Sequence, residues 1–212
     1  MSSSPEHRFF CIEGLDGCGK STQINLLCEE LGRRGFPTVR IREPGGTEIS
    51  EKIRNIILSP AHGAMNFTTE LLLYNAARAQ LLNEVVRPAL KQGKVVLADR
   101  FAWSSMAYQG YGRQLSLDTL RTVIDIAVED LWPSHTFILD IPVEVFRDRA
   151  AKENRVADRL EQEKHDFFNR VRQGYQQIAK DFPEKCSLLD GTQCKIDIHK
   201  NILDSILAHI TK

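Results

Sequence analysis

The sequence lacks the marks of a secreted, membrane or nucleic-acid-binding protein. Its five cysteines are an odd number and form no C-x-x-C pair, which argues against a disulfide framework or a zinc site. No apolar run approaches the ~18 residues of a membrane span, and the start, MSSSPEHR, has no signal-peptide core. The 28 basic side chains balance 28 acidic ones. We therefore expect a cytoplasmic protein with reduced thiols that binds neither nucleic acid nor membrane.

What the chain does have is an alternation of short β-rich runs and helical patterns. The runs predict five buried parallel strands at 8–13, 37–42, 94–98, 135–140 and 186–190. Helical patterns lie between and after them, at about 20–34, 47–58, 68–92, 117–130, 143–153, 159–180 and around 198–210. Right-handed crossovers then give an α/β fold, a five-stranded parallel sheet with helices on both faces. The length fits a single domain, residues 1–212, with ligands at the carboxyl ends of the strands.

The first strand runs into a phosphate-binding loop. The segment EGLDGCGKST fits G-x-x-x-x-G-K-[ST] at every fixed position and opens a helical pattern, as that motif requires. Lys20 is expected to reach the β- and γ-phosphates of ATP, and Ser21 to offer its hydroxyl to Mg²⁺. The residues expected to bind ATP here are Gly14, Leu15, Asp16, Gly17, Cys18, Gly19, Lys20, Ser21 and Thr22. Cys18 near a helix N-terminus is either a favoured thiolate that ATP shields or a buried inert thiol.

The ends of the other strands decide between a switch, a motor and a kinase. Outside the phosphate loop no D-x-x-G occurs, and the nearest guanine-binding match, Cys194-Lys195-Ile196-Asp197, lacks the amide or hydroxyl residue. A GTPase switch is therefore disfavoured. The second strand ends in REPGGT, which is either a plain turn or part of the site. The third ends in Asp99-Arg100, which can orient the water of Mg²⁺ and grip a second phosphate, with a structural salt bridge as the alternative.

Six segments in this order resemble the thymidylate kinase family in its bacterial form. They are FFCIEGLDGCGKST, REPGGTEISEKIR, ELLLYNAARAQ, DRFAWSSMAYQGYGR, DRLEQEKHDFFNRVRQGY and LLDGTQ, and they span about residues 8–193. The resemblance implies the P-loop kinase fold, usually as a homodimer, and transfer of the γ-phosphate of ATP to dTMP to give dTDP and ADP.

The resemblance also implies roles in the dTMP site. Arg100 would hold the dTMP phosphate, Asp99 would support Mg²⁺, and Asp16 would reach the 3′-hydroxyl. Tyr74 would stack on thymine and Arg78 would donate to its O4, although most relatives carry Phe at the first position, and a core tyrosine with a surface arginine is the alternative. The remaining implied contacts are Ser105 and Gln109 on the thymine edge and Tyr108 against C2′, where it would exclude ribose.

A charged stretch, about 147–159, is predicted to be a mobile lid over ATP, with a solvated helix face as the alternative. Relatives carry the catalytic arginine in the phosphate loop or in the lid, and here the loop position is Gly17. The implied catalytic residues are therefore Lys20, Arg100, Asp16 and the lid residue Arg155, with Arg159 as the alternative. Arg149 would stack on adenine, and Thr192 of the DGTQ segment would contact it.

Two other functions remain open. Another P-loop nucleoside monophosphate kinase would share the ATP half of the site, but Tyr74, Arg78 and Tyr108 argue against a different base or sugar. A nucleotide-binding regulatory protein would need the phosphate loop without a second set of anion and base contacts.

Overall fold

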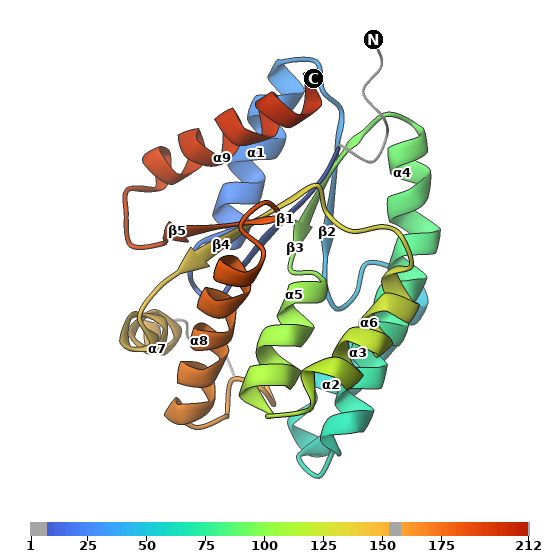
Figure 1. Cartoon of the computed structure of the whole chain (residues 1–212), viewed down its shortest axis with the longest axis vertical. Helices are drawn as coiled ribbons and strands as arrows, with labels where there is room; N and C mark the ends of the chain where they lie inside the picture. The colour runs from blue at the N-terminus through green and yellow to red at the C-terminus, as the bar shows by residue number, and fades with distance from the viewer. Residues whose placement is uncertain (1–7, 153–157, 212) are drawn as a thin grey trace.

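The computed structural model describes residues 8–152 and 158–211. Its sheet has five parallel strands in the order β2-β3-β1-β4-β5 (Figure 1). The strands are β1 Phe9–Gly14, β2 Thr38–Arg42, β3 Val95–Asp99, β4 His135–Asp140 and β5 Cys186–Asp190. The predicted five-stranded parallel sheet is thus confirmed, with each strand boundary within a residue of its expected place.

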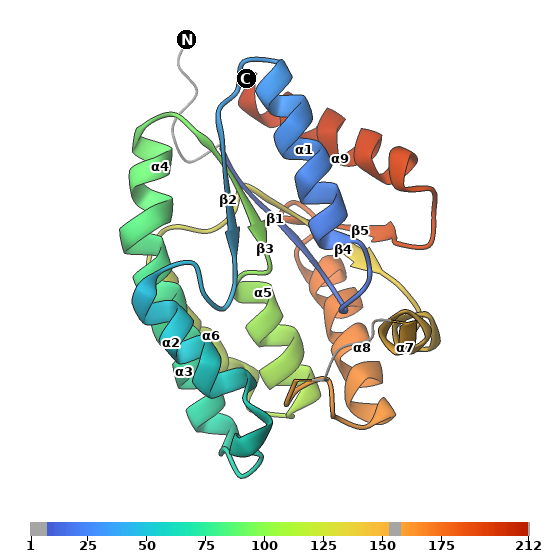
Figure 2. The same cartoon turned by 180° about the vertical axis from the view of Figure 1, so that it is seen from behind.

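Helices cover both faces of the sheet because successive strand residues point to opposite sides. On one side, Phe10 and Ile12 pack in a core with α1 (Lys20–Arg33) and α9 (Lys195–Ile210). On the other side, Phe9 and Cys11 pack with the π-helical η3 (Leu82–Val86), α4 (Arg87–Lys91) and α6 (Leu117–Val128). Figures 1 and 2 show α1 and α9 side by side on one face, and α4 and α6 away from them.

The other helices surround the carboxyl ends of the strands, and α8 also packs against β4 and β5. They are α2 (Glu48–Leu58), η2 (Pro60–His62), α3 (Phe67–Leu81), α5 (Ala102–Ser105), the π-helical η4 (Met106–Gly112), α7 (Val143–Lys152) and α8 (His165–Asp181). The predicted helix at 68–92 corresponds to α3, η3 and α4 in succession. None of the described helices is both long and apolar enough to cross a membrane.

Two helical boundaries differ from the sequence-based expectation. The helix formed by α5 and η4 was not among the predicted helices. A Cβ on Gly112 would lie 2.7 Å from the Phe167 ring, so this glycine permits close packing of α8 on η4. The helix predicted from 159 begins only at His165, because Asp158 Oδ1 accepts from the amides of Leu160 and Glu161 and folds this segment into a turn.

Candidate functional site

The phosphate loop connects β1 to α1 and has the backbone shape that its glycines permit. Gly14, Gly17 and Gly19 all have positive φ, at 132°, 68° and 105°. A Cβ on Gly14 would lie 2.4 Å from the carbonyl oxygen of Leu139, so β4 leaves no room for a side chain there. The loop backbone is therefore shaped to present amides at the N-terminus of α1, which is suited to bind phosphate.

Lys20 is buried at the base of this loop. Its Nζ donates to the carbonyl oxygens of Leu15 at 2.9 Å and Gly14 at 3.2 Å, and lies 3.7 Å from Asp16 Oδ1. A buried ammonium with these partners is a preformed cation at the start of the helix. A polyphosphate bound to the loop would compete with the carbonyl oxygens of Gly14 and Leu15 for the hydrogen bonds that this ammonium donates.

Ser21 and Asp99 fit a divalent cation of the magnesium type. The Ser21 hydroxyl donates to Asp99 Oδ2 at 2.7 Å, which joins the start of α1 to the end of β3. Two hard oxygen donors side by side suit Mg²⁺, which usually takes one or two protein oxygens and completes its shell with water and phosphate. The described residues contain no cluster of three or more acidic, histidine or cysteine side chains that would make a metal cage.

Arg100 is the centre of a polar cluster that extends from the end of β3. Its backbone has a φ of 71°, unusual outside glycine. Its Nη2 donates to Asp16 Oδ1 at 2.6 Å and to the Tyr108 hydroxyl at 3.1 Å, while Nη1 donates to the Tyr175 hydroxyl at 3.2 Å. Burial opposes the charge, but Asp16 and the surrounding hydroxyls raise the pKa of Arg100 well above its usual value. Arg100 is therefore a fixed, permanent cation.

Glu13 holds the chain that follows β3 in place, and it was not among the residues predicted from the sequence. The carboxylate is fully buried and accepts from the Phe101 amide at 2.8 Å, the Ser104 amide at 3.1 Å and the Ser104 hydroxyl at 2.6 Å. The Tyr175 hydroxyl donates to it at 2.8 Å. The signal in the sequence was a lone acid at the end of an otherwise apolar strand, next to the glycine that begins the phosphate loop.

A cavity of about 450 Å³ joins the phosphate loop to the ends of β2 and β3. Of the predicted site residues, it is lined by Asp16, Gly17, Gly19, Lys20, Ser21, Thr22, Tyr74, Asp99, Arg100, Ser105, Tyr108 and Gln109. Burial raises the pKa values of Tyr74 and Tyr108, so both phenols stay neutral. The sequence therefore identified most of the residues that enclose this space.

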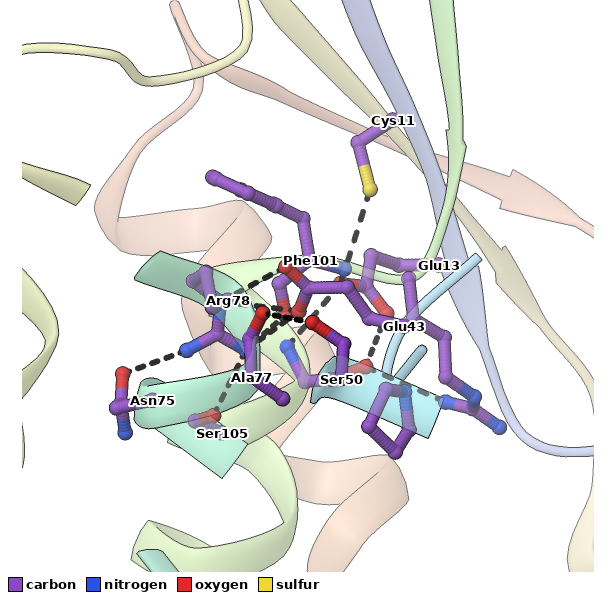
Figure 3. Close-up of polar contacts among 12 residues, drawn as sticks. Cys11, Glu13, Glu43, Ser50, Asn75, Ala77, Arg78, Phe101 and Ser105 are labelled. Carbon is purple, nitrogen blue, oxygen red and sulfur yellow. Dashed lines mark hydrogen bonds and ion pairs between the residues drawn. The ribbon is translucent and has the colours of Figure 1, made fainter. Parts of the chain in front are cut away.

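Arg78 does not line the cavity, and its guanidinium lies among polar groups of Glu43, Asn75 and Ser105 (Figure 3). It is 1% exposed and its Nε and Nη2 donate to Glu43 Oε2 at 2.9 and 2.7 Å. Its Nη1 donates to Asn75 Oδ1 at 2.7 Å, and Nη2 also donates to the Ser105 hydroxyl at 3.1 Å. Arg78 thus supports Ser105 and Glu43, which do line the cavity, and its contact with a base stays a prediction.

Other charged residues of the cavity were not predicted. Arg54 of α2 donates to the carbonyl oxygen of Pro44 at 2.8 Å, and burial together with the like charge of Arg42 lowers its pKa. Glu43, in the REPGGT turn, lines the same space, so this segment is part of the site rather than a plain turn. Burial raises the pKa of Glu43 to about 7, although Arg78 opposes the shift. Asp158 also lines the cavity, and burial raises its pKa.

The lid residues separate into three cases. Arg149 of α7 donates to the carbonyl oxygen of Gly17 at 2.7 Å, so it touches the phosphate loop. Arg159 is buried, and it donates to Glu70 Oε2 at 2.6 Å and to the carbonyl oxygen of Ile57 at 2.7 Å. Arg155 lies outside the described residues. Arg159 therefore has a structural anchor away from the phosphate loop, while Arg155 stays a prediction.

Two further predicted residues have local roles in the structure. The Thr192 hydroxyl, exposed after β5, donates to Asp190 Oδ1 at 2.6 Å. Cys18 is 2% exposed, and burial raises its pKa even though Lys20 opposes the shift. Of the two alternatives stated for Cys18, the structure supports the buried thiol, because the side chain lies in the core and is desolvated.

Comparisons of the sequence with known proteins identify its family. A sequence model of the thymidylate kinase family matches residues 12–202. A protein of Fervidobacterium nodosum named thymidylate kinase is 43% identical over 202 residues, covering 95% of this chain and 100% of that protein. A thymidylate kinase of Kosmotoga olearia is 45% identical over 204 residues, covering 96% of this chain and 97% of that protein. The predicted family is confirmed.

Proposed function

The chain belongs to the thymidylate kinase family, and we propose that it transfers the γ-phosphate of ATP to dTMP, giving dTDP and ADP. The observation that carries this proposal is that two sets of cationic side chains line one cavity. Lys20 lies at the phosphate loop, and Arg54 and Arg100 lie beyond it. Phosphoryl transfer requires two anionic substrates held in line with their charge neutralised, so it depends mainly on such positioning.

The ATP side of the reaction uses the loop from Gly14 to Thr22. Its backbone amides would hold the phosphates, and Lys20 would move its ammonium protons from the loop carbonyls to phosphate oxygens. Ser21 and Asp99 would hold Mg²⁺, which neutralises charge on the β- and γ-phosphates when bound. Arg149 and Thr192 would contact the adenosine side.

The acceptor side is built around Arg100. We assign the dTMP phosphate to Arg100 and Arg54, and the 3′-hydroxyl to Asp16, which binding of the phosphate would release from Arg100. Tyr108 would close the space beside C2′. The base contacts would come from Tyr74, Ser105 and Gln109, which line the cavity, and from Arg78, which donates to the Ser105 hydroxyl.

The lid would supply the remaining positive charge. Gly17 leaves the phosphate loop without an arginine at that position, and Arg159 is bonded to Glu70. We therefore propose Arg155 as the catalytic arginine of the lid at about 147–159.

The helices α2, α3 and α6 lie next to one another (Figure 2), and apolar side chains exposed on them support a homodimer. They are Ile49, Ile56, Phe67, Leu72, Leu117 and Ile126, the last 74% exposed. A second copy of the chain would cover them. Sedimentation should give a dimer for the parent and a monomer for Ile126→Glu combined with Leu72→Glu, and a monomeric parent would contradict the proposal.

Coupled turnover with ATP and dTMP tests the function, with Lys20→Ala and Arg100→Ala as the diagnostic variants. Both should stay folded and lose most of their turnover, because each removes a charge from a phosphate site. Turnover within about threefold of the parent in either variant would contradict the assigned role. ATP binding without phosphoryl transfer to any monophosphate would instead indicate a regulatory nucleotide-binding protein.

A further inference from the structure

A second cavity, of about 300 Å³, lies on the opposite side of the helical segment that lines the proposed dTMP site. Ser104, Ser105 and Tyr108 of α5 and η4 face the first cavity, whereas Trp103 and Met106 line the second. The helical period places these two sets on opposite faces of the same segment. The second cavity is completed by α6 and by the connections that precede β4 and β5.

Three aromatic side chains form its walls. The ring of Trp103 lies 4.8 Å from that of Trp132 and 4.8 Å from that of Phe182, with tilts of 49° and 39° between the planes. A volume of this size is at the lower end of small-molecule sites, and aromatic walls favour flat ligands that can stack or meet ring edges. The space suits a molecule of one or two fused rings.

Arg121 of α6, an exposed side chain, lines the cavity together with Lys185, Asp125 and Glu184. Its guanidinium lies over the Phe182 ring, 5.7 Å from the centroid, and pairs with no carboxylate in the parts of the chain that the structure describes. Asp125 is one helical turn away and does not pair with it. A stacked guanidinium with free donors suits a carboxylate, which it can bind through two parallel hydrogen bonds.

We propose that this cavity is a binding site for a planar aromatic carboxylate, with its ring against the cluster of Trp103, Trp132 and Phe182 and its carboxylate on Arg121. The ligand would cover the part of Trp132 that is exposed to water. It would also hold the Trp103 side chain in one position. No group of the phosphoryl-transfer site takes part in binding.

Ligand binding in the second cavity is coupled through α5 to dTMP binding in the first. This consequence rests on the proposed function. Trp103 precedes Ser104, which donates to Glu13, and Ser105, which accepts from Arg78. A ligand that shifts Trp103 therefore acts on two residues that shape the dTMP pocket. The coupling is reciprocal, so dTMP must change the affinity of this cavity by the same factor.

Trp103 and Trp132 are the two tryptophans of the chain, so fluorine NMR of protein labelled with 5-fluorotryptophan observes this cavity directly. Titration with 2-naphthoate should shift both signals to saturation. The neutral analogue 2-naphthamide should bind about tenfold more weakly, because it loses the charged pair with Arg121. Arg121→Gln should remove this difference. Arg87→Gln, whose guanidinium pairs with Glu129 and Asp130 instead, is the matched control and should retain it.

The absence of a saturable shift would overturn the site, and equal affinities for the two probes in the parent would overturn its preference for a carboxylate. If the fluorine signals shift with protein concentration in the absence of 2-naphthoate, a second copy of the chain covers the cavity. That result would also overturn the proposed ligand site. Saturating dTMP should change the Kd for 2-naphthoate by at least about threefold. An unchanged Kd would overturn the coupling without touching the kinase assignment, which fails only if dTMP is not phosphorylated.

Discussion

Arg100 at the end of β3 and Asp16 in the phosphate loop are joined by an ion pair of 2.6 Å between Nη2 and Oδ1. The pair links the two proposed halves of the site, because Asp16 is on the loop proposed for ATP and Arg100 is the residue proposed to hold the acceptor phosphate. In this proposal, a phosphate bound to Arg100 would compete with Asp16 and release its carboxylate toward the sugar. One rearrangement would then prepare both contacts to dTMP.

The buried acid Glu13 is predicted to position this pair. Glu13→Gln keeps the shape but replaces an acceptor oxygen with an NH₂ group that faces the amide and hydroxyl donors of Phe101, Ser104 and Tyr175. We expect a loss of about 1–3 kcal/mol in the free energy of unfolding and a raised KM for dTMP, with the KM for ATP changed less. Urea unfolding and steady-state kinetics measure the two effects. Glu84→Gln, at an exposed helix position, is the control, and parent-like kinetics in Glu13→Gln would refute the positioning role.

The raised pKa of Glu43 predicts a pH dependence of stability. Burial raises this pKa from 4.5 to about 7, so between these values the folded chain holds a proton that the unfolded chain has lost. The free energy of unfolding should therefore fall as pH rises from about 5 to 7, by about 3 kcal/mol at most from this group. Glu43→Gln cannot titrate, so its unfolding free energy should depend less on pH. Urea unfolding across this range tests the difference, and identical slopes in parent and variant would refute it.

The two lid arginines should give different defects. Arg159→Ala leaves the fully buried Glu70 with fewer partners, so we expect it to lose about 3 kcal/mol in the free energy of unfolding. Arg155→Ala should instead keep parent stability and lower kcat on the order of 10³-fold, with little change in the Kd for dTMP. Thermal unfolding and single-turnover rates separate the two. A stable Arg159→Ala with a large kcat defect, beside an active Arg155→Ala, would move the catalytic role to Arg159.

The sheet and the phosphate loop could be predicted because they depend on local pattern. Apolar runs and a fixed G-x-x-x-x-G-K-[ST] spacing need no tertiary information, and strand ends place Asp99 and Arg100 correctly. The roles of Glu13 and Arg54 could not be predicted, because they depend on which side chains meet across the fold. The α5 and η4 segment was missed, and its Gly112 serves packing against α8, a contact far away in sequence.

The same limit applies to Arg78 and Cys18. A spacing of four places Tyr74 and Arg78 on one helix face, yet only the packed structure shows that Glu43 and Asn75 bind the guanidinium. Proximity to a helix N-terminus favours a thiolate at Cys18, but burial outweighs this effect, because desolvation acts on the charged form most strongly in the core.

The central claim, that the cavity selects a thymine deoxynucleotide, is tested most directly by ADP production with dTMP, dUMP, dCMP and the ribose form of TMP. We expect dTMP to be fastest and dUMP slower by about 1–3 kcal/mol in kcat/KM for the lost methyl contact. The substrate dCMP should be slower still, because its amino group leaves a buried donor unpaired, and ribose TMP should hardly react. Tyr108→Ala should relax the sugar discrimination and keep the order of the bases, while Tyr108→Phe, which keeps the ring and loses the hydroxyl contact with Arg100, should retain the discrimination. Equal rates with dTMP and dCMP in the parent enzyme would contradict the account.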